Sequence, residues 1–164
     1  MGSANLTTLL AIAALAGAGS AGAAEITHDY ARPDARFASS VTIPAGAETV
    51  IFSGSLAPPS APGVTPVVEA NTESQTLAIF RGIETQLKAK GMTLADVVSL
   101  KVYLAGDPAK GGAMDFAGMN AAYAKLFGTK EQPHRPARST FQVAGLAVNG
   151  ALVEIDVVAA RVRP

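Results

Sequence analysis

Alternation of apolar and polar residues marks the strands of this chain. The most regular stretch is 96–104, DVVSLKVYL, in which every second position from Val98 to Leu104 is apolar. Because successive side chains of a strand point to opposite faces of a sheet, this pattern predicts a strand with one deeply buried face. Shorter alternating stretches at 36–44 and 48–54 predict two more strands.

Helical spacing replaces the alternation in two places. Between 72 and 91, Thr72 and Gln75 fit an N-terminal capping box, Gly91 fits a C-terminal stop, and one side is apolar: Leu77, Phe80, Ile83 and Leu87. Between 114 and 127 a second apolar stripe recurs at helical spacing: Phe116, Met119, Tyr123 and Phe127. The segment 55–70 contains four prolines and therefore predicts a loop.

Two further strands are predicted within His134–Ala160, and both carry charges among apolar residues. Arg138 lies in the first of these strands, and Glu154 and Asp156 share one face of the second. A charge inside an apolar strand costs free energy unless something compensates it. Either the charged faces are therefore solvated, or Arg138 and Glu154 belong to a ligand-binding or catalytic site.

Asn149-Gly150 lies between these two strands and predicts a tight hairpin, because a type I′ turn needs positive φ at both central positions. In that register Arg138 lies opposite Arg161. Arg138 and Glu154 are then about seven strand positions apart, roughly 23 Å at about 3.3 Å per residue. One small ligand can touch both only between two subunits, or in a different register.

The predicted order is strand, strand, helix, strand, helix, strand, strand. Helices grouped on one face of a sheet give an α+β fold, here a two-layer sandwich of a mixed β-sheet with two helices on one face. The other face of the sheet stays uncovered in this arrangement. A sheet with an apolar open face buries it against another copy, so we expect a homo-oligomer.

Composition narrows the chemistry. The chain has 164 residues, no cysteine, two histidines and a formal net charge of zero. Without cysteine there is no disulfide framework, no thiolate nucleophile and no lipid-modified cysteine, and two separate histidines do not form a zinc site. A balanced charge lacks the basic stripe that phosphate binding needs, so we expect no nucleic-acid partner. Because the sequence shows no group of ligating residues, we also expect no metal and no cofactor.

The first 24 residues differ from the rest. LTTLLAIAALAGAGSAGAA is apolar, rich in small residues, broken by glycine, and contains the A-x-A pattern Ala21-Gly22-Ala23. This predicts a secretory signal peptide over 1–24, a periplasmic or secreted protein with no membrane anchor after its removal, and one domain over 25–164. A signal peptide would require Lys or Arg at its start, but none precedes Leu6. The alternative is a disordered tail on a cytoplasmic protein.

Five segments in a fixed order resemble a known family. They are FSG at 52–54, QTLAIFRGIETQLKAKGMTLADVVSLKVYL at 75–104, MNAAYAKLF at 119–127, RPARST at 135–140 and VEIDVVA at 153–159. Together they are similar to the RidA (YjgF) family of enamine/imine deaminases, over nearly everything after about Phe37. The resemblance implies a chorismate-mutase-like fold, a homotrimer, and ligand clefts between subunits.

The resemblance also implies site residues. The carboxylate-binding arginine of the family falls on Arg138, its water-positioning glutamate on Glu154, and its cleft asparagine on Asn120. From the residues alone, a structural ion pair with Asp156 accounts for Arg138 as well as ligand binding does. A solvent-facing position on the second helix accounts for Asn120 better than a place in a cleft does. With the resemblance, Arg138 becomes the anchor for a substrate carboxylate.

The remaining expected substrate-binding residues include departures from the family pattern. Ser53 and Gly54 match its serine-glycine pair, although on sequence alone Gly54 is simply a turn residue. Phe37 stands where the family usually has a tyrosine, and a phenylalanine cannot hydrogen-bond a water or a leaving amine. Thr140 stands where a cysteine is often found, and Ser55 replaces a glutamine.

The expected reaction is hydrolytic deamination of small 2-imino or enamine carboxylates to 2-oxo acids and ammonia, with Arg138 and Glu154 as the catalytic pair. Arginine can hold a carboxylate through two parallel charge-assisted hydrogen bonds, and a carboxylate can orient a water as a base. The alternative is a non-catalytic module of the same fold that binds small carboxylates. A ribonuclease role, which is attributed to parts of the family, has no basic groove to support it.

Overall fold

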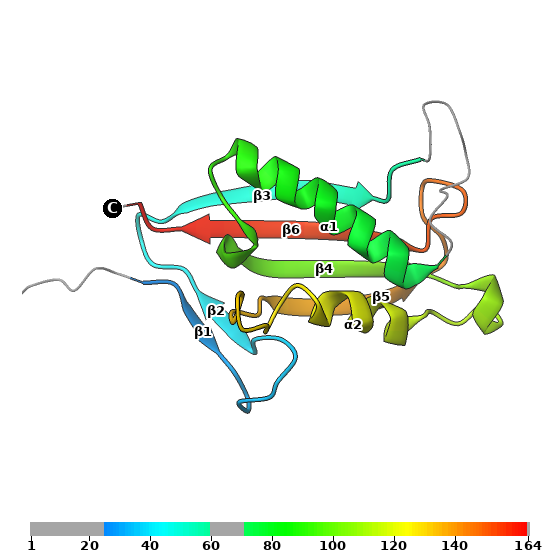
Figure 1. Cartoon of the computed structure of the whole chain (residues 1–164), viewed down its shortest axis with the longest axis horizontal. Coiled ribbons are helices and arrows are strands. Elements are labelled where there is room, and N and C mark those ends of the chain that lie inside the picture. Colours follow the sequence, from blue (N-terminus) through cyan, green and yellow to red (C-terminus); the bar gives the residue numbers. More distant parts are fainter. Residues whose placement is uncertain (1–24, 60–70, 164) are drawn as a thin grey trace, which may run out of the picture.

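The computed structural model describes residues 25–59 and 71–163 (Figure 1). Its elements are β1 (Thr27–Asp29), β2 (Ser40–Thr42), β3 (Glu48–Leu56), α1 (Thr72–Ala89), η1 (Leu94–Asp96), β4 (Val97–Ala105), η2 (Pro108–Lys110), α2 (Phe116–Ala124), β5 (Ala137–Val143) and β6 (Val153–Arg161). The expected signal peptide and most of the proline-rich loop lie outside the described residues. Within the described part, no helix is long and apolar enough to cross a bilayer.

Four strands form the main sheet, in the order β3-β6-β4-β5. β4 pairs with β5 in parallel, and β6 pairs with β3 and β4 in antiparallel fashion, so the sheet is mixed. Figure 1 shows α1 and α2 side by side on one face of this sheet. The core lies between the two layers and contains these side chains, among others: Phe80, Ile83, Leu87, Leu100, Leu104, Val153, Ile155 and Val157. The predicted fold class is confirmed.

The predicted hairpin between the last two strands is wrong. Gly150 does adopt the positive φ of a turn, at 78°, but β5 lies at the edge of the sheet and β6 enters between β3 and β4. β6 alternates between fully buried and half-buried residues, and a central position buries more of its apolar face than a hairpin at the edge. Gln75 of α1 supports this path, because its side-chain amide bonds Gly150 O at 2.9 Å and Leu152 N at 2.8 Å.

The first predicted strand, 36–44, is reduced to β2. It pairs with β1 in a separate two-stranded sheet, which the sequence did not predict. The intervening residues 30–39 form a loop, and Ala38 makes one parallel bridge to Ala137 at the start of β5. Phe37 therefore lies beside the main sheet without being part of it.

Side chains of β1 and of the loop that follows it hold the small sheet against the segment before β5. Arg135 lies over the Tyr30 ring, 4.2 Å from its centroid, and its backbone N–H donates to the Tyr30 hydroxyl at 3.1 Å. The ring of His28 stacks on that of His134 with 4.9 Å between centroids, and Nδ1 of His28 is 3.1 Å from Arg135 O. These contacts set the position of the loop that carries Phe37.

The start of α1 differs from the prediction by one residue. Asn71 is the N-cap and forms a reciprocal capping box with Ser74, in place of the predicted Thr72 and Gln75. Gln75 cannot serve because its side chain is buried and holds the start of β6. The helix ends as predicted, with Gly91 at a φ of 67°.

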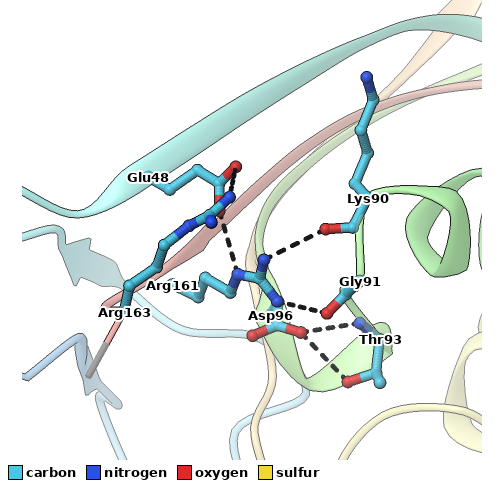
Figure 2. A network of polar contacts seen from close by, with 7 residues as sticks. All are labelled: Glu48, Lys90, Gly91, Thr93, Asp96, Arg161 and Arg163. Atoms are coloured by element: carbon cyan, nitrogen blue, oxygen red, sulfur yellow. Dashed lines mark hydrogen bonds and ion pairs between the residues drawn. The ribbon is translucent and has the colours of Figure 1, made fainter.

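Charged side chains tie the ends of β3, β6 and α1 together (Figure 2). Glu48 accepts from Arg161 Nε at 3.0 Å and from Arg163 Nη2 at 2.7 Å. The other guanidinium nitrogens of Arg161 donate to the carbonyls of Lys90 and Gly91, just after α1. One arginine thereby satisfies both a strand carboxylate and carbonyl groups that a helix end leaves without partners.

Candidate functional site

Arg138 lies on β5 with its side chain toward the helical layer. Its Cα pairs with that of Leu100, whose side chain is in the core between sheet and helices. Arg138 Nη2 donates to Asn120 Oδ1 at 2.8 Å, and Nη1 lies 3.6 Å from Met119 Sδ. A parallel edge strand next to α2 therefore brings Arg138 and Asn120 together across the layers.

Aromatic rings surround the guanidinium of Arg138. Its central carbon is 4.4 Å from the ring centroid of Tyr123, 5.2 Å from that of Phe37 and 6.0 Å from that of Phe116. Phe37 and Phe116 are each 42% exposed, so they form the outer part of this enclosure. Such contacts hold a cation without neutralising it.

A hollow of about 800 Å³ opens beside this group. Its lining comes from the 30–39 loop, the start of α2 and β5, and includes Arg36, Phe37, Phe116, Asn120 and Arg138. Asn120 is only 8% exposed, so the simpler expectation of a solvent-facing asparagine is wrong. We call this hollow the Arg138 cleft.

Burial and neighbouring charge act on the cation in this cleft. Burial lowers the pKa of Arg138 from its ordinary value, Tyr123 acts in the opposite direction, and the charge of Arg36 lowers it further. Burial also raises the pKa of the Tyr123 hydroxyl. Arginine nevertheless stays protonated in proteins, so the cleft presents a permanent positive charge.

Thr140 follows Arg138 on the same face of β5 and pairs with Val102 of β4. Its hydroxyl oxygen is buried and has no hydrogen-bond partner among the residues that the structure describes. Thr140 is not among the residues that line the Arg138 cleft. Its expected contact with a substrate stays a prediction.

Glu154 lies on the other face of the sheet. Its Cα pairs with that of Tyr103, and its Oε1 lies so close to Gly54 that a Cβ at position 54 would overlap it. Gly54 and Ser53 sit where the pairing of β3 with β6 shifts register, between Phe52 and Ser55. The glycine is therefore needed for close approach of the carboxylate.

The expected site residues thus form two groups that one chain does not bring together. Arg138, Asn120 and Phe37 lie at the Arg138 cleft, on the helical side, whereas Glu154 and Gly54 lie on the open face. The predicted pairing of Arg138 with Arg161 is wrong, since Leu100 takes that position. The conclusion that one chain cannot bring Arg138 and Glu154 to one small ligand still holds, because the sheet separates them.

The alternative ion pair between Arg138 and Asp156 is not formed. Asp156 lies on the open face, paired with Lys101. Its carboxylate accepts from the Tyr103 hydroxyl at 3.1 Å, which raises the Tyr103 pKa together with burial, the larger cause. The charge of Arg138 therefore has no carboxylate partner among the described residues.

Comparisons with known proteins place the chain. A family model described as endoribonuclease L-PSP matches residues 29–161. Reactive Intermediate Deaminase A, chloroplastic, from Arabidopsis thaliana is 36% identical over 92 residues, which cover 56% of this chain and 43% of the relative. The chain belongs to the RidA (YjgF) family. A RutC family protein of Saccharolobus solfataricus is 37% identical over 101 residues, covering 62% of this chain and 71% of that protein.

Solved structures of the RidA family share the fold. The Rid family protein YyfB from Yersinia pestis aligns with a TM-score of 0.60 and 26% identity over 76% of this chain and 86% of that one. TdcF of E. coli, solved with bound serine, aligns with a TM-score of 0.56 and 25% identity over 73% and 84% of the two chains. Both agree with two helices packed on a mixed sheet.

Sequence reasoning missed three residues around Arg138. Phe116 and Tyr123 were assigned only to the apolar stripe of the second helix, and Arg36 was not singled out. The spacing of Phe116 and Asn120, four residues apart on one helix, is the signal that places them on a common face. Within the described residues, no group of three or more acidic or histidine side chains is placed to hold a metal ion.

Proposed function

We propose that this protein is an enzyme that hydrolyses small 2-imino or enamine carboxylates to 2-oxo acids and ammonia. The observation that carries the proposal is the environment of Arg138: a half-buried guanidinium held by an amide and aromatic rings, with no carboxylate partner within the described residues, at the wall of a cleft. A group held in this way is available to an anionic ligand. The name of the Arabidopsis relative, a reactive intermediate deaminase, supports the same activity.

Arg138 binds the substrate carboxylate in this proposal. Asn120 Oδ1 and Met119 Sδ each accept from one N–H of its guanidinium, and the other donors of the arginine remain for a ligand. A bidentate contact with a carboxylate is short and directional, and it fixes the position of the adjacent imine carbon. The serine bound to the E. coli relative is a small amino acid with such a carboxylate, which supports a ligand of this size.

We infer that the complete site forms between two copies of the chain. The open face of the sheet carries Ile51 at 79% exposure and Phe141 at 50%, and it also carries Glu154. Packing of that face against the edge of a neighbouring copy buries these apolar residues and brings a carboxylate toward the neighbour's cleft. The family resemblance implies that the assembly is a homotrimer.

Glu154 of the adjoining copy then orients the attacking water. The water oxygen bonds to the imine carbon while Glu154 accepts one water proton and passes it to the imine nitrogen, which gives a tetrahedral aminol. Glu154 then carries the hydroxyl proton of the aminol to the same nitrogen, the carbon–nitrogen bond breaks, ammonia leaves, and the 2-oxo acid remains. Neighbouring groups on the open face include Asp156 and Tyr103. No metal or cofactor takes part in this sequence of steps.

A second candidate function is a module that binds small carboxylates without turnover. One observation favours it: the ring of Phe37 stands over Arg138, where the resemblance places a tyrosine, and it has no hydroxyl to bond water or the leaving amine. In both functions Arg138 binds the carboxylate of the ligand, and only the first function includes hydrolysis of the imine. Phe37→Tyr separates them, because a hydroxyl at this position raises turnover only if imine hydrolysis occurs there.

The test uses freshly generated 2-aminoacrylate and follows ammonia release. The wild-type protein should accelerate release, Arg138→Ala should reduce kcat/KM by at least about a hundredfold through loss of the charge-assisted bonds, and Arg138→Lys should recover only part of it. Arg32→Ala, an exposed arginine paired with Asp34 at 2.8 Å, is the control. Carboxylate binding without any acceleration establishes the second candidate, and neither binding nor acceleration removes both.

A further inference from the structure

The Arg138 cleft contains a second guanidinium that the proposed reaction does not use. Arg36 precedes Phe37 in the 30–39 loop, is exposed, and lines the same hollow as Arg138. Within residues 25–59 and 71–163 it makes no hydrogen bond or ion pair. Arg32, a few residues earlier, pairs with Asp34. Arg36 is therefore available to an anion that enters the cleft.

The two positive charges are close enough to act on each other. Arg36 lowers the pKa of Arg138 through its charge, so the cleft concentrates positive potential. The only carboxylate among the described residues that line it is that of Asp115. That group caps α2 by accepting from Gly118 N at 3.0 Å, with Lys110 Nζ at 3.9 Å. The cleft wall thus offers two cations and no free acid.

An apolar substrate side chain can contact the apolar part of the lining, which includes Met114, Ala117 and Ala121, but it leaves Arg36 without an anion. The exposed rings, Phe37 and Phe116, already face the guanidinium of Arg138 at 5.2 and 6.0 Å. An apolar side chain that reaches Arg36 would displace water from it and supply no acceptor in return, which is unfavourable. A ligand with a second carboxylate supplies that acceptor and matches the charge of the site.

We propose that Arg36 is a specificity-determining residue that binds the second carboxylate of a dicarboxylic substrate. The cleft then prefers 2-imino dicarboxylates, such as the imines of aspartate and glutamate, over the imines of neutral amino acids. This inference rests on the proposed function for its catalytic consequence. The recognition of two carboxylates can be measured without any turnover.

The kinetic test compares the imines of aspartate and asparagine, which have nearly the same shape and differ in one charge. Generated in situ by oxidation of the parent amino acids, the aspartate imine should be hydrolysed with a kcat/KM about tenfold higher, the gain of one charge-assisted hydrogen bond. Arg36→Gln should abolish this preference, so that the kcat/KM values for the two imines become equal. Arg36→Lys should retain part of it, and Arg32→Gln all of it.

The binding test distinguishes this inference from the proposed function. Calorimetric titration with 2-oxoglutarate and with 4-methyl-2-oxopentanoate, a singly charged 2-oxo acid, should give tighter binding of the former, lost in Arg36→Gln. That result without turnover overturns the proposed function and leaves the inference standing. Equal affinities in the wild type, or an Arg36→Gln variant that loses subunits by light scattering, overturn the inference, since Arg36 then serves no ligand or serves contact between copies.

Discussion

At Arg138, a half-buried cation is held by neutral groups alone. An amide oxygen, a thioether and the faces of three aromatic rings surround it. A carboxylate partner would stabilise the same position but cancel the charge, whereas cation–π contacts of about 0.5–2 kcal/mol each offset part of the burial cost and leave the charge in place. This arrangement suits a binding group better than a structural one.

Gly54 allows a direct test of the open-face half of the proposed site. Gly54→Ala should displace the Glu154 carboxylate, because the new Cβ would overlap its Oε1, and should lower turnover by about tenfold or more, since small displacements of a catalytic group are costly. Gly82→Ala is the matched control. Its Cβ meets nothing within 4 Å, and it should stabilise α1 by about 0.5–1 kcal/mol.

Both glycine variants need steady-state kinetics and denaturant unfolding. An unchanged kcat in Gly54→Ala, with the fold retained, would contradict a role for Glu154 at its observed position. Carboxylate binding at the Arg138 cleft should be nearly the same in Gly54→Ala, because the cleft lies on the other side of the sheet.

Among the elements, β3, β6 and the segment after α1 are joined through the pair formed by Glu48 and Arg161. Hydrogen bonds from Arg163 and Arg161 lower the pKa of Glu48 from 4.5 to about 2. A depressed carboxyl pKa means that the folded state binds the proton less readily than the unfolded state. The stabilisation is therefore complete above the unfolded pKa and is lost as the pH falls through that of the folded state.

Glu48→Gln should consequently lower stability at neutral pH, and most of that difference should be gone at about pH 2. Urea midpoints measured between pH 7 and pH 2 should converge for wild type and variant, with the difference shrinking below about pH 4.5. Glu131→Gln, in an exposed loop, is the control for loss of one negative charge. A difference that persists unchanged at pH 2 would show that the contribution of Glu48 is not electrostatic.

For the whole molecule, the decisive feature is the face of the sheet that carries neither helix. Apolar side chains there, Ile51 and Phe141, are more exposed than any in the core, and Tyr103 stacks on Phe141 with 6.2 Å between ring centroids. We propose that this face is an interface between copies, because exposed apolar side chains that lie together favour association. The proposed assembly covers this face and supplies each Arg138 cleft with a neighbour's Glu154.

Ile51→Asp should therefore dissociate the assembly while each copy stays folded, because Ile51 is 79% exposed in a single chain. We expect light scattering to show a trimer for the wild type and a monomer for the variant. Turnover should fall with the loss of subunits. Thr85→Asp, on the exposed side of α1, adds the same charge and should leave the trimer intact. An active monomer would refute a site shared between copies.

Much of the fold was predictable because the signals are local. The alternation in 96–104 identified β4, and the helical stripes identified α1 and α2. A turn does form at Asn149-Gly150, but only Gly150 has positive φ, so the predicted type I′ turn is wrong. The hairpin prediction failed because a tight turn does not specify which strands pair. The family resemblance predicted Asn120 and Phe37 as site residues. Arg36 was missed, because the sequence of a loop does not show which part of the fold it will contact.

The sequence by itself determined which segments are strands and helices and which residues share a face, because those follow from the two-residue and 3.6-residue repeats of the backbone. Only the tertiary structure decided the order β3-β6-β4-β5, because strand pairing is a competition among distant segments for burial. That order put Arg138 and Glu154 on opposite sides of one sheet and brought Arg36 into the Arg138 cleft.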